Sequence, residues 1–374
     1  MNKHLLYKEL EVWYEVNHRI LPWRETDDPY KIWISEIILQ QTRVAQGMEY
    51  YHRLITRFPD IQSLADAEED EVLLYWQGLG YYSRARNLHK AAQLMKNHEI
   101  FHQAMRLLSD KARGEEIFAA LKSMPGVGDY TAGAIASFAF DLPYPALDGN
   151  VYRVLSRLYD CEIAFDTTQG KKHFRQLAEE LLDREHPRLF NSAIMELGAL
   201  HCVPTAPDCS TCPLNTWCKA LANNTVELLP VRKPRPKVRD RYLEYTIYIT
   251  PERTTLIHQR KGNDIWKHLW EFVETTNVNS LINDNINNLR GNQLPAALQR
   301  NTSELSELLN PYKVIEITHV LSHQKLHARF VIKNVPELPA IPDTVVVSLS
   351  DLDNYAFSRL TLNAIEKLLI PHHS

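Results

Sequence analysis

Four of the five cysteines lie within seventeen residues and are separated by six, two and five residues. Thiolate sulfur at such spacing can bind zinc or an iron–sulfur cluster. Structural zinc usually takes two Cys-x-x-Cys pairs, and this stretch has a single one. A reducing compartment disfavours disulfides. We therefore favour a [4Fe–4S] cluster over zinc and treat Cys161, outside the spacing, as an inert thiol. The predicted ligands are Cys202, Cys209, Cys212 and Cys218.

A segment with closely spaced glycines offers a second chemical possibility, the binding of phosphate. It reads Met124-Pro-Gly-Val-Gly-Asp-Tyr-Thr-Ala-Gly and lies between apolar stretches with helical spacing. Gly126 and Gly128 permit a tight turn, and the next helix presents unpaired N–H groups and the positive end of its dipole. These groups can hold a DNA phosphate without a basic side chain. The alternative is an ordinary corner between helices, but the cysteine stretch in the same chain makes us favour phosphate binding.

Helices must position both motifs. Before residue 200 the apolar residues recur at helical spacing, as at Ile34, Ile37 and Ile38, and ten of the 12 glycines lie there at turn positions. After a stretch rich in proline, lysine and arginine, β-branched residues alternate as in strands. Expected strands are 245–249, 255–257, 314–317, 328–332 and 345–347, with helices around 296–309 and 359–369. We predict an all-α domain over residues 1–224, an extended linker over 225–241 and an α+β domain over 242–374.

Length and composition argue against other classes of protein. The chain has 374 residues, 44% hydrophobic and 24% charged, as in soluble globular proteins of two domains. Its longest nearly apolar run, 132–140, is shorter than the ~20 residues that span a bilayer, and no signal-peptide pattern is evident. We expect a cytoplasmic protein that does not enter a membrane. The net charge of −4 argues against a uniformly basic nucleic-acid binder, so DNA affinity must come from local patches and backbone groups.

These motifs together resemble a known family. The glycine segment, the sequence Leu147-Asp-Gly-Asn-Val and the cysteine stretch resemble the helix-hairpin-helix DNA glycosylase superfamily with a [4Fe–4S] cluster. Three further segments narrow the resemblance to adenine DNA glycosylases of the MutY type: Leu21-Pro-Trp-Arg, Ser35-Glu-Ile-Ile-Leu-Gln-Gln-Thr and Gly78-Leu-Gly-Tyr-Tyr-Ser-Arg-Ala-Arg-Asn-Leu. The resemblance implies a monomer that binds double-stranded DNA and removes adenine mispaired with 8-oxoguanine or guanine, the lesion strand being read by the second domain.

Two carboxylates are expected to cleave the bond between adenine and its sugar. Such cleavage needs protonation of the leaving base and stabilisation of a cationic sugar. The resemblance makes Glu36 the general acid, although its spacing alone indicates a solvated helix residue. Apolar neighbours such as Ile37 and Leu39 could raise its pKa by desolvation. The resemblance makes Asp148, which also fits a helix N-cap, the group facing the sugar, and Asn150 the residue that positions the water or Asp148.

Other residues are assigned by the same resemblance. The target base must leave the stack before it is cut, and Gln41 and Tyr81 match residues that wedge into the duplex. The alternatives are simple exposure for Gln41 and ordinary aromatic packing for Tyr81. Gly126 and Gly128 would hold a backbone phosphate. The expected lining of the adenine pocket is Trp23, Arg24, Leu39 and Glu196.

Tyr130 occupies a position that separates two mechanisms. In the related endonuclease III branch a lysine stands there and attacks the sugar as an amine nucleophile. A phenol cannot form an imine, so the resemblance implies a monofunctional glycosylase. One alternative is a glycosylase/lyase that acts on oxidised pyrimidines, which Tyr130 disfavours. Another is a non-catalytic lesion-binding protein whose carboxylates are structural.

The C-terminal region resembles the opening of a Nudix (MutT-like) fold over 245–249 and 259–273. A pyrophosphohydrolase of that fold needs an Arg-Glu-x-x-Glu-Glu helix for magnesium. The chain continues instead as Glu274-Thr-Thr-Asn-Val-Asn-Ser, so we expect recognition rather than hydrolysis.

Histidines in this region raise the question of a metal site. His319, His323 and His327 recur every four residues, as metal ligands on a helix can. Alternation from 317 to 330 favours a β-hairpin instead, with its turn near residue 323. The resemblance implies that Ser322 and His323 contact 8-oxoguanine, with Leu321 where the family has phenylalanine.

Overall fold

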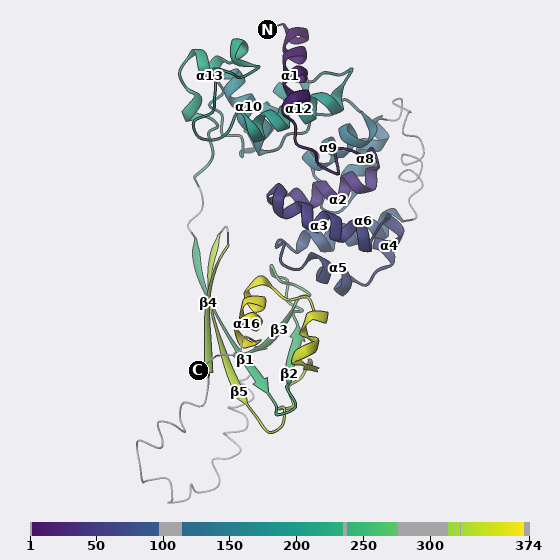
Figure 1. Ribbon diagram of the computed structural model, residues 1–374, viewed down its shortest axis with the longest axis vertical. Helices are drawn as coiled ribbons and strands as arrows, with labels where there is room; N and C mark the ends of the chain where they lie inside the picture. Colours follow the sequence, from purple (N-terminus) through teal and green to yellow (C-terminus); the bar gives the residue numbers. More distant parts are fainter. Residues whose placement is uncertain (1, 97–113, 235–237, 276–312, 322, 370–374) are drawn as a thin grey trace, which may run out of the picture. The chain divides into compact units, whose positions relative to one another are not determined.

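The computed structural model describes residues 2–96, 114–234, 238–275, 313–321 and 323–369. The chain divides into two compact units, one of residues 1–67 with 86–235 and one of residues 68–85 with 236–374. Helices build the first unit, and a mixed sheet with helices builds the second (Figure 1). This confirms the predicted fold class, a helical region followed by an α+β region.

Two central helices of the first unit carry the residues expected to do chemistry. α2 (Pro29–Leu39) packs against α9 (Asp129–Phe140), and both are buried along most of their length. α9 carries four alanines and Gly133, where an added Cβ would lie 2.6 Å from the Pro145 carbonyl oxygen. Several polar side chains on these two helices, Glu36 among them, are buried away from water.

The remaining helices of the first unit pack against this pair or against one another. A core shared by several of them includes Leu10, Leu155, Phe174 and Leu197. The helices are α1 (Lys3–Asn17), α3 (Val44–Arg57), α4 (Ile61–Asp66), α8 (Gly114–Ser123), α10 (Gly149–Tyr159), α11 (Thr168–Leu181), α12 (Pro187–Leu200) and α13 (Lys219–Ala222); α6 (Ser83–Met95) starts in the second unit's segment. None of the helices in the described ranges is long and apolar enough to cross a bilayer.

The sheet of the second unit has the strand order β4-β5-β1-β3-β2-β6. β1 and β5 pair in parallel, with Arg239 opposite Gln324, and the other neighbours pair antiparallel. β4 and β5 form the expected hairpin, in which the Leu321 N–H donates to the Gln324 carbonyl (2.7 Å). The strands are β1 (Arg239–Ile249), β2 (Thr254–Gln259), β3 (Trp270–Glu274), β4 (Lys313–Val320), β5 (Gln324–Asn334) and β6 (Thr344–Ser348).

Helical segments complete the second unit. α16 (Arg359–Leu369), expected from the sequence, packs against β4 (Figure 1). The 3₁₀ segment η5 (Leu349–Asn354) precedes it. α5 (Glu69–Trp76), which the sequence places in the helical domain, belongs to this unit by its packing.

Two of the sequence predictions concern the linker over 225–241 and the helix around 296–309. Within the predicted linker, Val226–Leu228 form a 3₁₀ turn and residues from 239 onward belong to β1, because backbone groups there find partners. The exact domain boundaries stay a prediction. The helix predicted around 296–309 lies outside the described residues.

Candidate active site

The two predicted catalytic carboxylates, Glu36 and Asp148, lie on helices whose starts are set by local capping residues. Asp28 caps α2 by accepting from the Tyr30 N–H (2.9 Å), and Pro29 begins the helix, which sets Glu36 on its buried side. Asp148 is the N-cap of α10 and accepts from the N–H groups of Asn150 (2.9 Å) and Val151 (2.7 Å). Asp148 can therefore cap α10 and also serve in the active site.

Glu36 is a buried acid with a neutral partner. Glu36 is 4% exposed. Tyr130 Oη, from the first turn of α9, donates to Glu36 Oε2 (2.8 Å). Burial raises the pKa of Glu36 to about 7, while the bond from Tyr130 and the charge of Arg24 oppose the rise. Near neutral pH about half of the carboxyls at such a pKa carry a proton. Glu36 can therefore donate one.

Asp148 and Tyr130 have different environments from Glu36. Burial raises the pKa of Asp148, but three donors favour its anion: the two helix N–H groups and the Asn150 amide (2.8 Å to Oδ2). Burial and the nearby carboxylates raise the pKa of Tyr130 well above its usual value, so it stays a phenol. Each of these side chains influences the pKa of Glu36, which places them in one site.

Asn150 is held in one orientation by an arginine that the sequence did not single out. Arg153 Nη2 donates to Asn150 Oδ1 (2.9 Å) and to the Gly198 carbonyl (2.5 Å), and its Nε donates to the Cys202 carbonyl (2.7 Å). A Cβ at Gly198 would lie 2.7 Å from Asn150 Cβ, so α12 must carry glycine here. The amide nitrogen of Asn150 is thus directed at Asp148.

Glu196 sits in an arginine cluster. It is buried, and Arg19 donates to it from Nε (2.5 Å), Nη2 (2.9 Å) and the backbone N–H (3.1 Å). Arg24 Nη2 lies 3.8 Å from the same carboxylate. Burial alone would raise the pKa of Glu196, but these cations lower it. Arg19 was missed by sequence reasoning, because its segment before Leu21 carries no recognisable pattern.

The other two predicted pocket residues pack within the helical unit. Trp23 is buried, with its ring edge-to-face against Tyr51 at 5.2 Å between centroids. Leu39, at the end of α2, reaches to within 2.8 Å of where a Cβ would stand at Gly47 of α3. Whether they contact adenine stays a prediction.

Both predicted wedge residues have a strained backbone. Gln41 follows α2 with φ at +57° and is exposed, and Tyr81 has φ at +50° and is 45% exposed. Residues other than glycine rarely adopt this left-handed conformation, and such strain gathers at functional sites. The sequence motifs alone did not indicate it.

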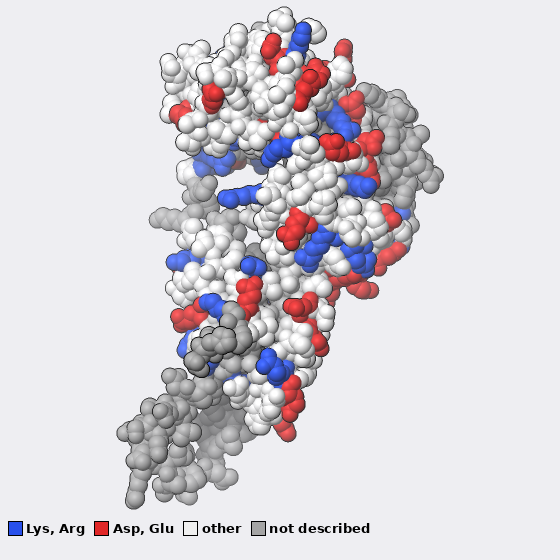
Figure 2. Space-filling view, viewed as in Figure 1, with Lys and Arg blue, Asp and Glu red and all other residues white. Residues whose placement is uncertain are grey.

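The glycine segment forms the predicted turn. Gly126 has φ at +80°, and the Val127 N–H donates to the Met124 carbonyl (3.1 Å). Gly128 is the N-cap of α9, where no side chain of the described residues caps the helix and an added Cβ would meet nothing within 4 Å. The first-turn N–H groups of α9 are thus accessible to an anion. Figure 2 shows both signs of charge scattered over the visible face rather than a broad basic field.

The four predicted ligand cysteines gather at the end of α12 and the start of α13. Burial, with the neighbouring thiols, raises the pKa of Cys212 to about 12 and also raises those of Cys209 and Cys218. Arg157 is buried among them. Its Nη1 lies 3.4 Å from Cys202 Sγ, and it also donates to the carbonyls of Val203 and Pro204 within the loop and of Val226 after it. Within the described ranges no three His, Cys, Asp or Glu residues are arranged so that they could hold one metal ion. Cys161 is buried in the helical core.

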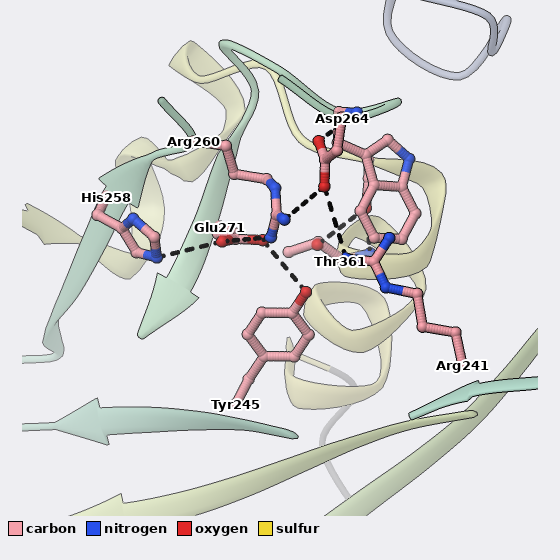
Figure 3. Close-up of polar contacts among 9 residues, drawn as sticks. Arg241, Tyr245, His258, Arg260, Asp264, Glu271 and Thr361 are labelled. Atoms are coloured by element: carbon pink, nitrogen blue, oxygen red, sulfur yellow. Dashed lines mark hydrogen bonds and ion pairs between the residues drawn. The ribbon is translucent and has the colours of Figure 1, made fainter. Parts of the chain in front are cut away.

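The second unit contains a polar network of its own. Glu271 on β3 is 2% exposed and accepts from Arg260 Nη1 (2.7 and 2.6 Å) and Tyr245 Oη (3.1 Å), and His258 Nε2 lies 3.2 Å from it (Figure 3). Arg260 also pairs with Asp264 (2.5 Å). Ser322 lies outside the described residues, and His323 is exposed beside the hairpin turn.

Comparisons with known proteins agree with this architecture. Residues 34–184 match the model of the HhH-GPD superfamily base excision DNA repair protein, and residues 245–367 match that of the NUDIX domain. A solved thermostable thymine-DNA glycosylase aligns with a TM-score of 0.51 at 24% identity, over 59% of this chain and 97% of its own, which shows the fold alone.

Relatives named adenine DNA glycosylase cover much of the chain. That of Mus musculus is 39% identical over 236 residues, which are 61% of this chain and 44% of that protein. That of Buchnera aphidicola subsp. Baizongia pistaciae is 32% identical over 328 residues, which are 86% of this chain and 84% of that protein. A chain with this identity over most of both sequences belongs to the adenine DNA glycosylase family, hydrolases of N-glycosyl bonds that serve base excision repair.

Proposed function

We propose that the chain removes adenine mispaired with 8-oxoguanine or guanine from double-stranded DNA, as a monofunctional enzyme. The observation that carries this proposal is Glu36, an acid buried between α2 and α9 with a pKa of about 7. A buried carboxyl that keeps its proton at neutral pH suits protonation of a leaving base.

The reaction begins with a proton from Glu36. The proton passes to adenine N7, and the bond between the base and the sugar breaks with its electron pair going to the base. The sugar becomes an oxocarbenium-like cation, which the Asp148 carboxylate stabilises from the other side. Water then adds to the cation and gives up a proton to the Glu36 carboxylate, which restores the acid. Asn150, directed by Arg153, fixes Asp148 in the orientation that this step needs.

Tyr130 supports the absence of a lyase step. It stands where a nucleophilic lysine would be needed, and its phenol, which donates to Glu36, cannot form an imine. Its role is instead to orient the acid. We therefore expect the DNA strand to stay intact after the base is released.

DNA contacts would come from backbone groups and protruding residues. The α9 N-terminus behind Gly126 and Gly128 would hold a phosphate, and Gln41 and Tyr81 would fill the gap left by the flipped adenine. Ser322 and His323 would read 8-oxoguanine. We expect a monomer that acts on the chromosome in the cytoplasm.

A [4Fe–4S] cluster fits the cysteine loop. The thiols lie close enough to raise one another's pKa values, because their thiolate forms repel one another. The positive charge of an iron–sulfur cluster would compensate this repulsion and favour the thiolates. Cys202, Cys209, Cys212 and Cys218 would hold it. Bound there, the cluster would supply thiolate cross-links that join the end of α12 to α13. The iron content and visible absorbance of the purified chain test this, with Cys209→Ser as the variant expected to lose both.

The test of function uses a duplex labelled on the strand that carries adenine opposite 8-oxoguanine. After incubation, half of the sample receives hot alkali. Strand breakage in the alkali-treated half alone is the expected result, because an abasic site is left without lyase chemistry. Breakage in both halves would contradict monofunctionality. An intact strand in both halves, despite binding, would instead favour a non-catalytic lesion reader.

A further inference from the structure

The loop that carries Tyr81 is built to project one side chain. Between α5 and α6 the backbone has positive φ at Gly78 (+93°), Gly80 (+79°) and Tyr81 (+50°). Arg84 Nη2 donates to the Gly80 carbonyl (3.1 Å), and its guanidinium lies over the Tyr81 ring at 5.5 Å. A loop with this backbone strain keeps its shape only where the surroundings determine it.

Both ends of this loop are bonded to one residue far along the chain. The Phe357 N–H donates to Gln77 Oε1 (2.7 Å), and Tyr82 Oη donates to the Phe357 carbonyl (3.1 Å). Tyr82 Oη also accepts from the Gly78 N–H (3.2 Å). Phe357 and Tyr82 are both buried. Because Gln77 and Tyr82 flank residues 78–81, the backbone of Phe357 clamps the loop from either side.

Phe357 is itself fixed by the sheet. It forms an isolated parallel bridge with Trp270 on β3, next to the bond from the Trp270 N–H to the Ala356 carbonyl (2.8 Å). Trp270 pairs with Gln259 in β2, and both side chains bond to Asp70 of α5, at 3.4 Å from Trp270 Nε1 and 2.7 Å from Gln259 Nε2. α5 and the loop after it are thus tied to the sheet at two places.

The neighbouring pair of the same two strands faces the other way. His258 pairs with Glu271, and both point into the polar network with Arg260 and Tyr245 (Figure 3). Side chains alternate between the faces of a sheet. One face of this strand pair is therefore held by buried ion pairs, while the other holds α5.

We propose that Gln77, Tyr82 and the Phe357 backbone are positioning elements for the wedge, so that the C-terminal region sets the place of Tyr81 against the lesion. This inference rests on the proposed function, in which Tyr81 fills the gap left by the flipped adenine. It goes further in assigning control of that wedge to the sheet rather than to the helical unit.

The experiment measures wedging separately from excision. The full chain is bound to a duplex with 2-aminopurine next to 8-oxoguanine and with a non-excisable adenine analogue opposite the lesion. Unstacking by the wedge raises the 2-aminopurine fluorescence. Tyr81→Ala sets the signal without a wedge. Tyr82→Phe and Gln77→Met should lower the unstacking equilibrium by about threefold to tenfold, as expected for the loss of one or two buried hydrogen bonds.

Two controls separate positioning from general loss of stability. Tyr245→Phe removes another buried tyrosine hydroxyl bond of the same unit, to Glu271, and should leave the fluorescence at the wild-type level. Gln77→Glu keeps an oxygen acceptor for the Phe357 N–H and should retain the signal. Adding Tyr82→Phe to Tyr81→Ala should change nothing further, because both act through one side chain.

The outcomes also separate this inference from the proposed function. Wild-type signal in Tyr82→Phe and Gln77→Met, or a loss equal to that of Tyr245→Phe, would overturn the clamp while adenine release on natural duplex stands. Failure of the wild-type chain to release adenine would overturn the proposed function. The fluorescence result would still decide the clamp, because it requires no excision.

Discussion

Each unit buries a glutamate that accepts a hydrogen bond from a tyrosine. The two carboxylates differ in whether an arginine is bonded to them as well. Glu36 in the helical unit receives Tyr130 Oη at 2.8 Å, and Glu271 in the sheet receives Tyr245 Oη at 3.1 Å. Their exposed fractions, 4% and 2%, are nearly the same. Glu271 also receives a buried arginine, whereas Arg24 reaches Glu36 through its field alone among the described residues.

The difference shows how burial becomes either chemistry or structure. A buried carboxylate with an arginine partner has its charge compensated. A buried carboxyl whose hydrogen-bond donor is a phenol loses hydration without a cation bonded to it, so its pKa rises toward neutral pH. The missing arginine partner therefore matters as much for the pKa of Glu36 as its burial does.

The largest expected effect comes from the same substitution at the two glutamates. Glu36→Gln should lower the single-turnover rate of adenine release by about 100- to 10,000-fold, the usual contribution of a general acid. Glu271→Gln should leave the rate per folded molecule unchanged. Duplex binding, followed by fluorescence anisotropy, should survive in both. Excision at the wild-type rate by Glu36→Gln would remove the basis of the comparison.

Stability should respond in the reverse sense. Glu271→Gln leaves the buried charge of Arg260 without its main partner and should lower the free energy of unfolding by about 3 kcal/mol. Denaturant unfolding followed by fluorescence measures this change. The control is Glu244→Gln, which removes an exposed pair with Arg329 at 3.9 Å and should cost less than about 1 kcal/mol. Equal losses in the two variants would contradict a structural role for Glu271.

Replacing Glu36 by glutamine should stabilise the protein at alkaline pH. The pKa of Glu36 is about 7 in the folded chain against an ordinary 4.5, so above pH 4.5 the unfolded state gives up a proton that the folded state keeps. Folding stability therefore falls as pH rises from 4.5 to 7. Glu36→Gln lacks this titration and should be more stable than wild type at pH 8 by up to about 3 kcal/mol. Unfolding curves at pH 5 and pH 8 check it; a difference that does not grow with pH would count against the raised pKa.

The smallest effects are expected from the two tyrosines. In the proposed mechanism Glu36 acts in its protonated form, so the rate of base release should fall as pH rises through about 7. The bond from Tyr130 lowers the pKa of Glu36, so Tyr130→Phe should move that fall to higher pH. Tyr245→Phe should leave the pH profile in place and lower the free energy of unfolding by about 1 kcal/mol. Identical profiles for all three proteins would show that Tyr130 does not tune the acid.

The fold class could be predicted because its signals are local. Helical spacing around Ile34 and alternation around Phe330 follow from which side of an element is buried, and both appear in α2 and β5. The N-cap at Asp148 could also be predicted, because an N-cap side chain bonds to N–H groups only two and three residues away. The placement of Glu36 and Tyr130 in one site needed the family resemblance, because spacing alone indicated a solvated Glu36.

The rest depends on contacts that no local pattern encodes. Arg19 meets Glu196 across 177 residues, and Tyr82 meets the Phe357 carbonyl across 275. The partner of Tyr82 is moreover a backbone oxygen, which carries no side-chain signature. The Arg260–Glu271 pair likewise requires the register of β2 against β3, which sequence alternation does not specify.

The parallel pairing of β1 with β5 imposes an order of events on the nascent chain. Arg239 must wait for Gln324, and the Tyr81 loop must wait for Phe357, whereas every residue of the first unit precedes residue 236. Non-local pairing is slow, and domains fold as they emerge during synthesis. The helical unit can thus fold early on the ribosome, while the Tyr81 loop forms its bonds to Phe357 among the last steps. A chain released too soon would bury Glu36 before the Tyr81 loop is fixed.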